Sequence, residues 1–261
     1  MNRVTAVLVI VVLAMAAFIV TQARRVPPRP ELASTPAPAD SALPVASLQQ
    51  SAGETGLVGI KQSSLPAPKR DLAEIQRRLS SGESGTYIRE ILLQRGDNIA
   101  RWPDREAEPL RVWIQPTSTL ADFRVSYPVR AREAFERWTH IGVPVSYTFV
   151  VDSAAADIPV TWVDRFDMPI TGRTRWMHDQ NWWIVGSSIE VALHQQSGAP
   201  LDPEAIYAIT LHEVGHVLGL DHTQDERSIM AARVRVRQLS DVDERTVQLI
   251  YSLPPGSVIK P

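Results

Sequence analysis

The pattern of apolar and polar positions divides the chain into four parts. Residues 4–20 are almost entirely apolar, whereas the sequence that follows, to about residue 70, is rich in Pro, Ala, Ser and Gln. Apolar residues then recur at helical spacing over 71–108, and strand and helix patterns alternate over 109–261. This predicts a signal peptide or membrane anchor over 1–25, a disordered linker over 26–70, a helical hairpin extension and a folded domain.

The extension over 71–108 has the pattern of two short helices. Asp71 is suited to cap the first helix, the stretch SGESG marks a turn, and WPDREAEP at 102–109 ends the second. The sequence favours a packing extension and leaves open a propeptide or a partner-docking element. The apolar positions of the two helices are Leu72, Ile75 and Leu79, then Tyr87, Ile88, Ile91 and Leu92.

The last part of the chain predicts an α+β domain with a twisted mixed β-sheet, because strand and helix patterns interleave. Runs rich in β-branched and aromatic residues indicate strands, and capping residues followed by apolar positions at helical spacing indicate helices. The expected strands are 110–114, 145–152, 157–164 and 182–193, and the expected helices begin near Ser126, Asp202 and Val242.

The composition excludes several kinds of catalytic and metal-binding site. The 261 residues include no cysteine, which excludes disulfides, cysteine nucleophiles and thiolate metal sites. A transition metal would therefore need nitrogen and oxygen ligands. The net charge of −2 gives no reason to expect a nucleic-acid partner.

Three of the six histidines stand within the stretch LHEVGHVLGLDH at 211–222. His212 and His216 are four apart on a predicted long helix, so both rings lie on one face and can reach one zinc ion. Gly219 is placed to end the helix, and the turn returns His222 toward the ion. Three histidines leave one tetrahedral position open for water, which is typical of a catalytic zinc site. Glu213 is the expected general base that activates the zinc-bound water for attack on a carbonyl carbon.

These residues, HEVGHVLGLDH, resemble the metzincin metallopeptidases and, within them, the matrixins, the matrix metalloproteinase type. The resemblance implies a zincin-like fold with a long active-site helix, a C-terminal helix and one catalytic zinc. It implies that Met230 is the Met-turn residue beneath the metal, and LSDVDERTVQLIYSLPPG at 239–256 resembles the matrixin C-terminal helix. Asp243 lines up with an acidic position of that pattern, although Asp241 and Asp243 are interpreted as charges that complement the helix dipole.

The chain departs from the matrixin pattern in several places. Without cysteine there is no cysteine switch, so any latency needs another mechanism. The histidine set of a second, structural zinc is incomplete, and His178 and His194 are interpreted as surface or strand residues. The Asp/Gly-rich loops of structural calcium sites are sparse, so neither calcium nor a second zinc is predicted. Ala232 stands where some metzincins have a tyrosine metal ligand, so a tyrosine ligand is not expected.

The resemblance implies a protein or peptide substrate bound as an extended strand against an edge strand of the sheet. We expect WWIVGSSIEVAL at 182–193 to be this edge strand, with Ile184, Val185 and Gly186 in contact with the substrate. Arg233 follows Met230 in the region that forms the wall of the matrixin specificity pocket. It is a further candidate for substrate binding.

The N-terminus predicts an extracytoplasmic location. The apolar run 4–20 is followed by the small-residue sequence Thr21-Gln22-Ala23, which favours cleavage as a signal peptide over a membrane tether. The leading hypothesis is therefore an exported zinc endopeptidase. The alternatives are a non-catalytic binding module with the same fold and a structural envelope protein that interacts through its Pro-rich linker and helical hairpin.

Overall fold

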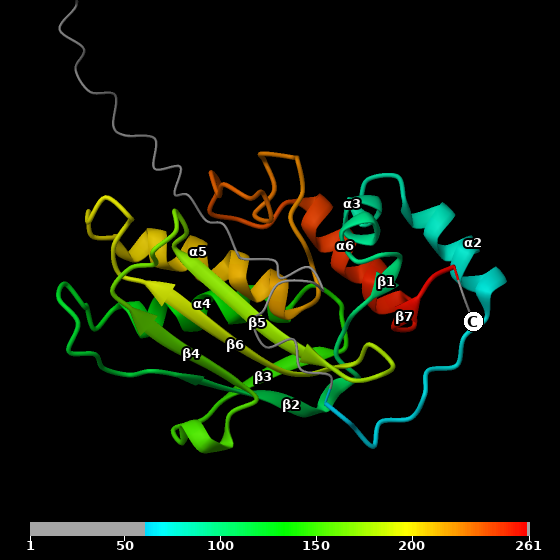
Figure 1. The fold of residues 1–261 in the computed structure, drawn as a ribbon, viewed down its shortest axis with the longest axis horizontal. Coiled ribbons are helices and arrows are strands. Elements are labelled where there is room, and N and C mark those ends of the chain that lie inside the picture. Colours follow the sequence, from blue (N-terminus) through cyan, green and yellow to red (C-terminus); the bar gives the residue numbers. More distant parts are fainter. Residues whose placement is uncertain (1–60, 260–261) are drawn as a thin grey trace, which may run out of the picture. The chain divides into compact units, whose positions relative to one another are not determined.

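A computed structural model describes residues 61–259 of the chain (Figure 1). The predicted signal peptide or anchor over 1–25, including the possible membrane tether through 4–20, lies outside these residues, as does most of the predicted linker. Within 61–259, no helix has the length and hydropathy that a membrane span requires.

A five-stranded mixed sheet lies at the centre of the described residues, in the order β3-β2-β4-β6-β5. β2 pairs in parallel with β3 and with β4, and β4 pairs in parallel with β6, whereas β5 runs antiparallel to β6. The predicted mixed sheet and α+β class are confirmed. The strands are β2 (Arg105–Ile114), β3 (Val145–Phe149), β4 (Ile158–Val163), β5 (Gly172–His178) and β6 (Ile184–Ala192).

Residue alternation explains why these segments form strands. In β4, Ile158, Val160 and Trp162 are buried while the residues between them are half-buried, which is the period of two that a pleated strand requires. β2 begins at Arg105, five residues before the predicted strand. It therefore crosses the predicted boundary between the helical extension, 71–108, and the folded domain, 109–261. A short 3-10 turn, η1 (Ser153–Ala155), connects β3 to β4.

Two helices pack side by side against the sheet (Figure 1). α4 (Tyr127–Thr139) contacts β2 and β3, and α5 (Pro203–Val217) contacts β5 and β6. The Asp202 side chain caps α5, because its Oδ1 accepts a hydrogen bond from the backbone N–H of Ala205 at 2.7 Å. With α4 on one side and the sheet on another, α5 is buried along nearly its whole length.

The predicted helices of the extension form and pack against α6 (Asp241–Ser252). They are α2 (Leu72–Gly82), which Asp71 caps as expected, and α3 (Ile88–Gln94). A short antiparallel pair, β1 (Asn98–Ile99) and β7 (Gly256–Ser257), joins the end of the extension to the C-terminal part of the described chain.

The prediction that 182–193 forms the edge strand is wrong. β6 lies between β4 and β5, and β5, which the sequence did not predict, is the edge strand on that side of the sheet, opposite β3. Ile184 is fully buried, and its backbone N–H donates to the Arg101 carbonyl at 2.9 Å. Contact of Ile184, Val185 and Gly186 with a substrate strand therefore loses its structural basis.

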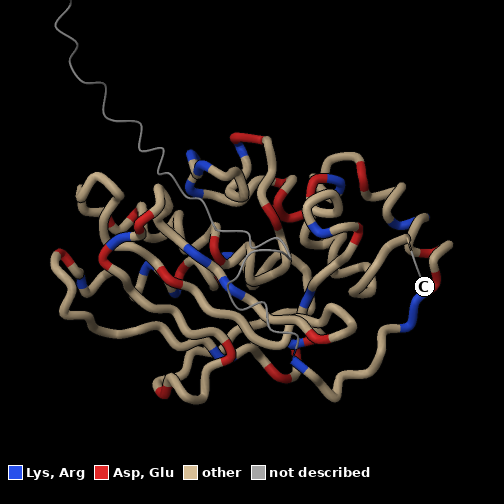
Figure 2. The backbone as a smooth tube through the Cα atoms, viewed as in Figure 1, with Lys and Arg blue, Asp and Glu red and all other residues tan. Residues whose placement is uncertain are grey.

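Charged residues of both signs are interspersed along the described backbone (Figure 2). Many of them pair with each other, as Arg130 does with Glu204 at 2.6 Å and Arg137 does with Glu244 at 2.6 Å. The expectation that nucleic acid is not a partner stays a prediction from the low net charge.

Candidate metal centre and catalytic carboxylate

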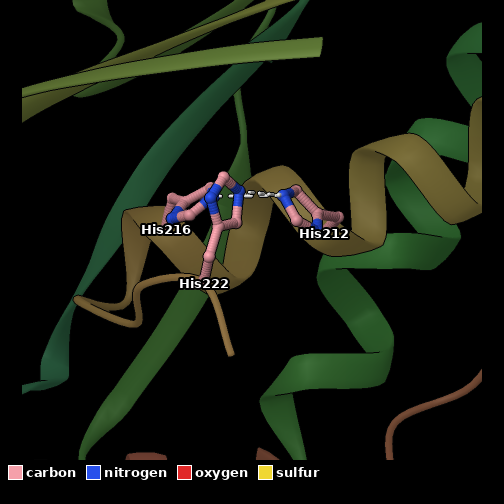
Figure 3. A group of neighbouring side chains, drawn as sticks. All are labelled: His212, His216 and His222. Atoms are coloured by element: carbon pink, nitrogen blue, oxygen red, sulfur yellow. Dashed lines mark hydrogen bonds between the residues drawn. The ribbon is translucent and has the colours of Figure 1, made fainter. Parts of the chain in front are cut away.

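The C-terminal end of α5 and the turn after it bring three histidines together (Figure 3). The Nε2 atoms of His212 and His216 are 3.1 Å apart, and those of His212 and His222 are 3.3 Å apart. One ring nitrogen of each residue lies within 4.8 Å of the others. The three residues that the sequence singled out as ligands thus form one cluster.

The chain reverses at Gly219. This residue has a φ of +97°, in the left-handed region that glycine adopts at low cost, and it directly follows the last residues of α5. A Cβ at position 219 would also collide with the Ala100 carbonyl oxygen. After the reversal, the Leu220 N–H donates to the Gly215 carbonyl at 2.9 Å, which ends the helix and directs the chain toward His222.

Backbone carbonyls orient two of the three rings. Nδ1 of His212 lies 2.6 Å from the Ile229 carbonyl oxygen, and Nδ1 of His216 lies 2.9 Å from the Leu220 carbonyl oxygen. Because a carbonyl oxygen only accepts, each Nδ1 carries the proton and each Nε2 presents its lone pair to the cluster. Burial lowers the pKa of His212 to about 3 and also lowers the pKa values of His216 and His222, so the neutral form is favoured.

This donor set fits a zinc ion. A tetrahedral ion with Zn–N distances of about 2.0–2.1 Å separates its nitrogen ligands by about 3.3–3.4 Å. The two Nε2–Nε2 distances, 3.1 and 3.3 Å, are close to that separation. Two unprotonated nitrogens cannot share a hydrogen bond, so a cation is the partner that suits them.

Glu213 is buried and incompletely paired. The Thr174 hydroxyl, on β5, lies 2.7 Å from Glu213 Oε2 and donates to it, whereas Oε1 is buried without a hydrogen-bond partner. Burial raises the pKa of Glu213 to about 8, against the opposing influence of the Thr174 hydroxyl and the Arg173 guanidinium. A buried carboxylate oxygen without a partner suits a site where a ligand or a reacting group binds.

Met230 lies beneath the helical part of the cluster. Its side chain is fully buried, and its Sδ packs against Gly215, at a spot that a Cβ at position 215 would occupy. Glycine at this position therefore lets the methionine approach the helix between the two histidines that α5 carries.

Asp243 has a larger role than the sequence suggested. Its carboxylate is fully buried and accepts hydrogen bonds from the Ser228 hydroxyl, the Ile229 N–H at 3.1 Å and the Tyr87 hydroxyl at 3.2 Å. The interpretation of Asp243 as a simple complement to the helix dipole is therefore wrong. Instead, Asp243 fixes the segment that orients His212 through the Ile229 carbonyl.

The remaining candidates lie outside the cluster. His178 is buried at the end of β5, where its ring stacks on Trp182 at 4.3 Å between centroids. His194 is buried at the end of β6, beside Asp122 and Asp164. Arg233 is exposed after Met230, and its role in substrate binding stays a prediction.

Sequence reasoning missed β5 and Thr174, the partner of Glu213. No spacing signal marked them, because Thr174 lies 39 positions from Glu213 and meets it only through the tertiary fold.

Comparisons with known proteins agree with this geometry. The family model described as Matrixin matches residues 112–252, a little over half of the chain. The chain is also 25% identical over 177 residues to Metalloendoproteinase 2-MMP of Arabidopsis thaliana. That similarity covers 60% of this chain but only 44% of the plant protein.

Proposed function

The chain belongs to the matrixin family, and on that premise we propose that it is an exported zinc-dependent endopeptidase with Glu213 as its general base. One observation carries the proposal. Three imidazoles converge through Nε2, and Glu213, next to His212 in the helix, keeps one carboxylate oxygen buried and without a hydrogen-bond partner.

His212, His216 and His222 would hold the ion through their Nε2 atoms. When bound there, zinc supplies Lewis acidity, which polarises a peptide carbonyl and acidifies water. The protein contributes the orientation of two rings through backbone carbonyls and a closely packed floor at Met230.

Glu213 would move the protons of the reaction. A cation held by the histidines would favour the ionised carboxylate against the rise in pKa that burial causes. In that form the carboxylate takes a proton from the attacking water as the water oxygen bonds to the carbonyl carbon, and it then gives that proton to the amine nitrogen as the C–N bond breaks. The Thr174 hydroxyl holds Oε2, whereas Oε1 has no hydrogen-bond partner and packs over Gly172 on β5, where a Cβ at position 172 would lie.

We place the substrate peptide along β5. This strand is one of the two edges of the sheet, and α5 contacts it directly, with Thr174 of β5 bonded to Glu213. A peptide added to this edge would therefore run beside the part of α5 that carries the cluster. Backbone hydrogen bonds to β5 would supply much of the binding, as in other cases of strand addition.

The test is cleavage of a mixed peptide library by the purified chain with one equivalent of zinc. Glu213→Ala is expected to retain zinc but to lose at least about a hundredfold in turnover, the low end of a general base's contribution. The matched control is Glu204→Ala, a partly exposed glutamate in the first turn of the same helix, which should retain both zinc and activity.

Full activity of Glu213→Ala would remove the proposed role of this residue. Absence of cleavage by the wild type despite bound zinc would favour the alternative, a non-catalytic binding module with the same fold.

Export is proposed on the apolar run at 4–20 alone. Recovery of the protein from the cytoplasm of its native cells would overturn it.

A further inference from the structure

The segment that carries the third histidine is held by the N-terminal extension. We call residues 219–224 the ligand loop. Three side chains from α3 and the residue after it reach this loop, and they are Glu90, Gln94 and Arg95. These contacts join parts of the chain that are more than 120 positions apart.

Arg95 makes the most extensive of these contacts. Its Nη2 donates to Asp221 Oδ1 at 2.7 Å, its Nε lies 2.6 Å from Asp221 Oδ2, and its Nη1 donates to the Gly219 carbonyl at 2.9 Å. Both side chains of the ion pair are buried, with 7% and 6% of their surface exposed. The guanidinium also lies 5.0 Å from the centroid of the Trp176 ring on β5. A buried, planar arginine that meets a carboxylate and a carbonyl together fixes the loop in one geometry.

The other two side chains hold the loop on either side of the histidine. The Gln94 amide donates to the His222 carbonyl at 2.9 Å. The Glu90 carboxylate accepts from the Thr223 hydroxyl at 3.0 Å and from the Gln224 N–H at 2.8 Å. Contacts from the extension thus extend along the ligand loop from residue 219 to residue 224.

The need for such support follows from where the ligands lie. His212 and His216 are fixed relative to each other by the helix that carries both, whereas His222 lies beyond the helix end, and its position depends on the contacts of the loop. Loss of a group that orients a metal ligand commonly weakens metal binding by about 10–100-fold.

We propose that α3 and Arg95 are an integral part of the metal centre and that Arg95 is a positioning residue, which holds His222 in place through the ligand loop. This inference rests on the proposed function, because it assumes that the three histidines bind zinc. The sequence left open whether 71–108 is a propeptide, and on this proposal residues 90–95 belong to the active enzyme.

The experiment measures the zinc dissociation constant of the full-length protein by competition with a chelator. Arg95→Met, which keeps an unbranched apolar stem but removes the guanidinium with its charge and donors, is expected to weaken zinc binding about 10–100-fold. Arg89→Met is the matched control, because Arg89 lies on the same helix, pairs with Glu83 and is exposed. It should bind zinc as the wild type does.

A second readout separates positioning from stability. In the cobalt-substituted protein, the visible absorption of tetrahedral Co²⁺ should shift or weaken in Arg95→Met and remain unchanged in Arg89→Met. Should Arg95→Met fail to fold, Gln94→Leu decides, because it removes only the hydrogen bond to the His222 carbonyl and is expected to weaken zinc binding about threefold or more.

Wild-type zinc affinity and an unchanged cobalt spectrum in folded Arg95→Met would overturn the inference while leaving the proposed function intact. If Gln94→Leu decides, wild-type affinity in that variant has the same meaning. Failure of the wild type itself to bind zinc would instead overturn the proposed function, and with it the inference.

Discussion

The histidines of the metal centre and His194 are all largely withdrawn from solvent, yet their surroundings favour opposite charge states. At the centre, Nδ1 of His212 and of His216 faces a backbone carbonyl, and burial lowers the pKa values. Beyond the end of β6, both ring nitrogens of His194 face carboxylates, with Nε2 3.0 Å from Asp122 Oδ2 and Nδ1 2.9 Å from Asp164 Oδ1; the Asp164 carbonyl oxygen lies farther from Nδ1, at 3.3 Å. The hydrogen bond to Asp122 is the main cause that raises the pKa of His194.

The difference shows that burial alone does not decide what a histidine does. A carbonyl at Nδ1 fixes the neutral tautomer and leaves Nε2 free to bind a cation. Two carboxylates instead favour a proton on each nitrogen, which makes the ring a cation itself and a poor metal ligand. The nearest polar partners of the ring therefore separate a metal ligand from a structural ion-pair partner.

The largest expected effect comes from removing a histidine of the cluster formed by His212, His216 and His222. His216→Ala and His222→Ala should each weaken zinc binding more than about 100-fold, which exceeds the usual cost of losing a group that only hydrogen-bonds to a metal ligand. The reason is that each substitution removes a ligand atom as well as the tetrahedral geometry. Chelator competition or bound-metal analysis measures the effect.

His194→Gln is the matched control for these variants, because it removes another buried histidine. It should bind zinc like the wild type. Equal zinc loss in His194→Gln would contradict the distinction between the two sites, and full zinc occupancy in both alanine variants would remove the metal assignment.

A smaller effect is expected from a change in the packing of Met230 against Gly215, beneath the histidine cluster. Gly→Ala inside a helix usually stabilises by about 0.5–1 kcal/mol, but a Cβ at position 215 would meet Met230 Sδ. Overpacking of this kind costs about 1–3 kcal/mol, so Gly215→Ala should lower the free energy of unfolding. Chemical denaturation of the zinc-free protein checks this, and a more stable variant would show that Met230 moves aside without cost.

The histidine cluster could be predicted from the sequence because its geometry is local. His212, His216 and Gly219 act through the pitch and the end of one helix, which spacing alone describes. The sheet class and most helices could also be predicted, since residue periodicity determines them.

The supporting contacts could not be predicted, because they depend on tertiary structure. Arg95 meets Asp221 across 126 positions, and Tyr87 meets Asp243 across 156. β5 was not predicted because its sequence, GRTRWMH, begins with a glycine and includes two arginines. Charges of this kind are common on edge strands, where they discourage pairing with other chains, but they obscure the strand pattern.

The smallest effect is expected at His194, and pH dependence reveals it. Because the pKa of His194 is raised in the folded state, the protonated ring stabilises the fold fully below the unfolded pKa of about 6.5. This stabilisation is lost as pH rises through the folded pKa. The charged groups that face the ring are Asp122 and Asp164, and Arg165 pairs with Asp164 at 2.8 Å.

His194→Gln should therefore destabilise the protein more at pH 5.5 than at pH 8.5. The difference between the two pH values should be under about 1 kcal/mol, because both carboxylates are about half exposed and solvent screens the pairs. Urea denaturation of both proteins at the two pH values measures it, and added salt should reduce it. A loss of stability that is equal at both pH values would mean that the His194 ring stabilises the fold through packing alone. His194 and the clustered histidines would then differ in their location and not in their charge state.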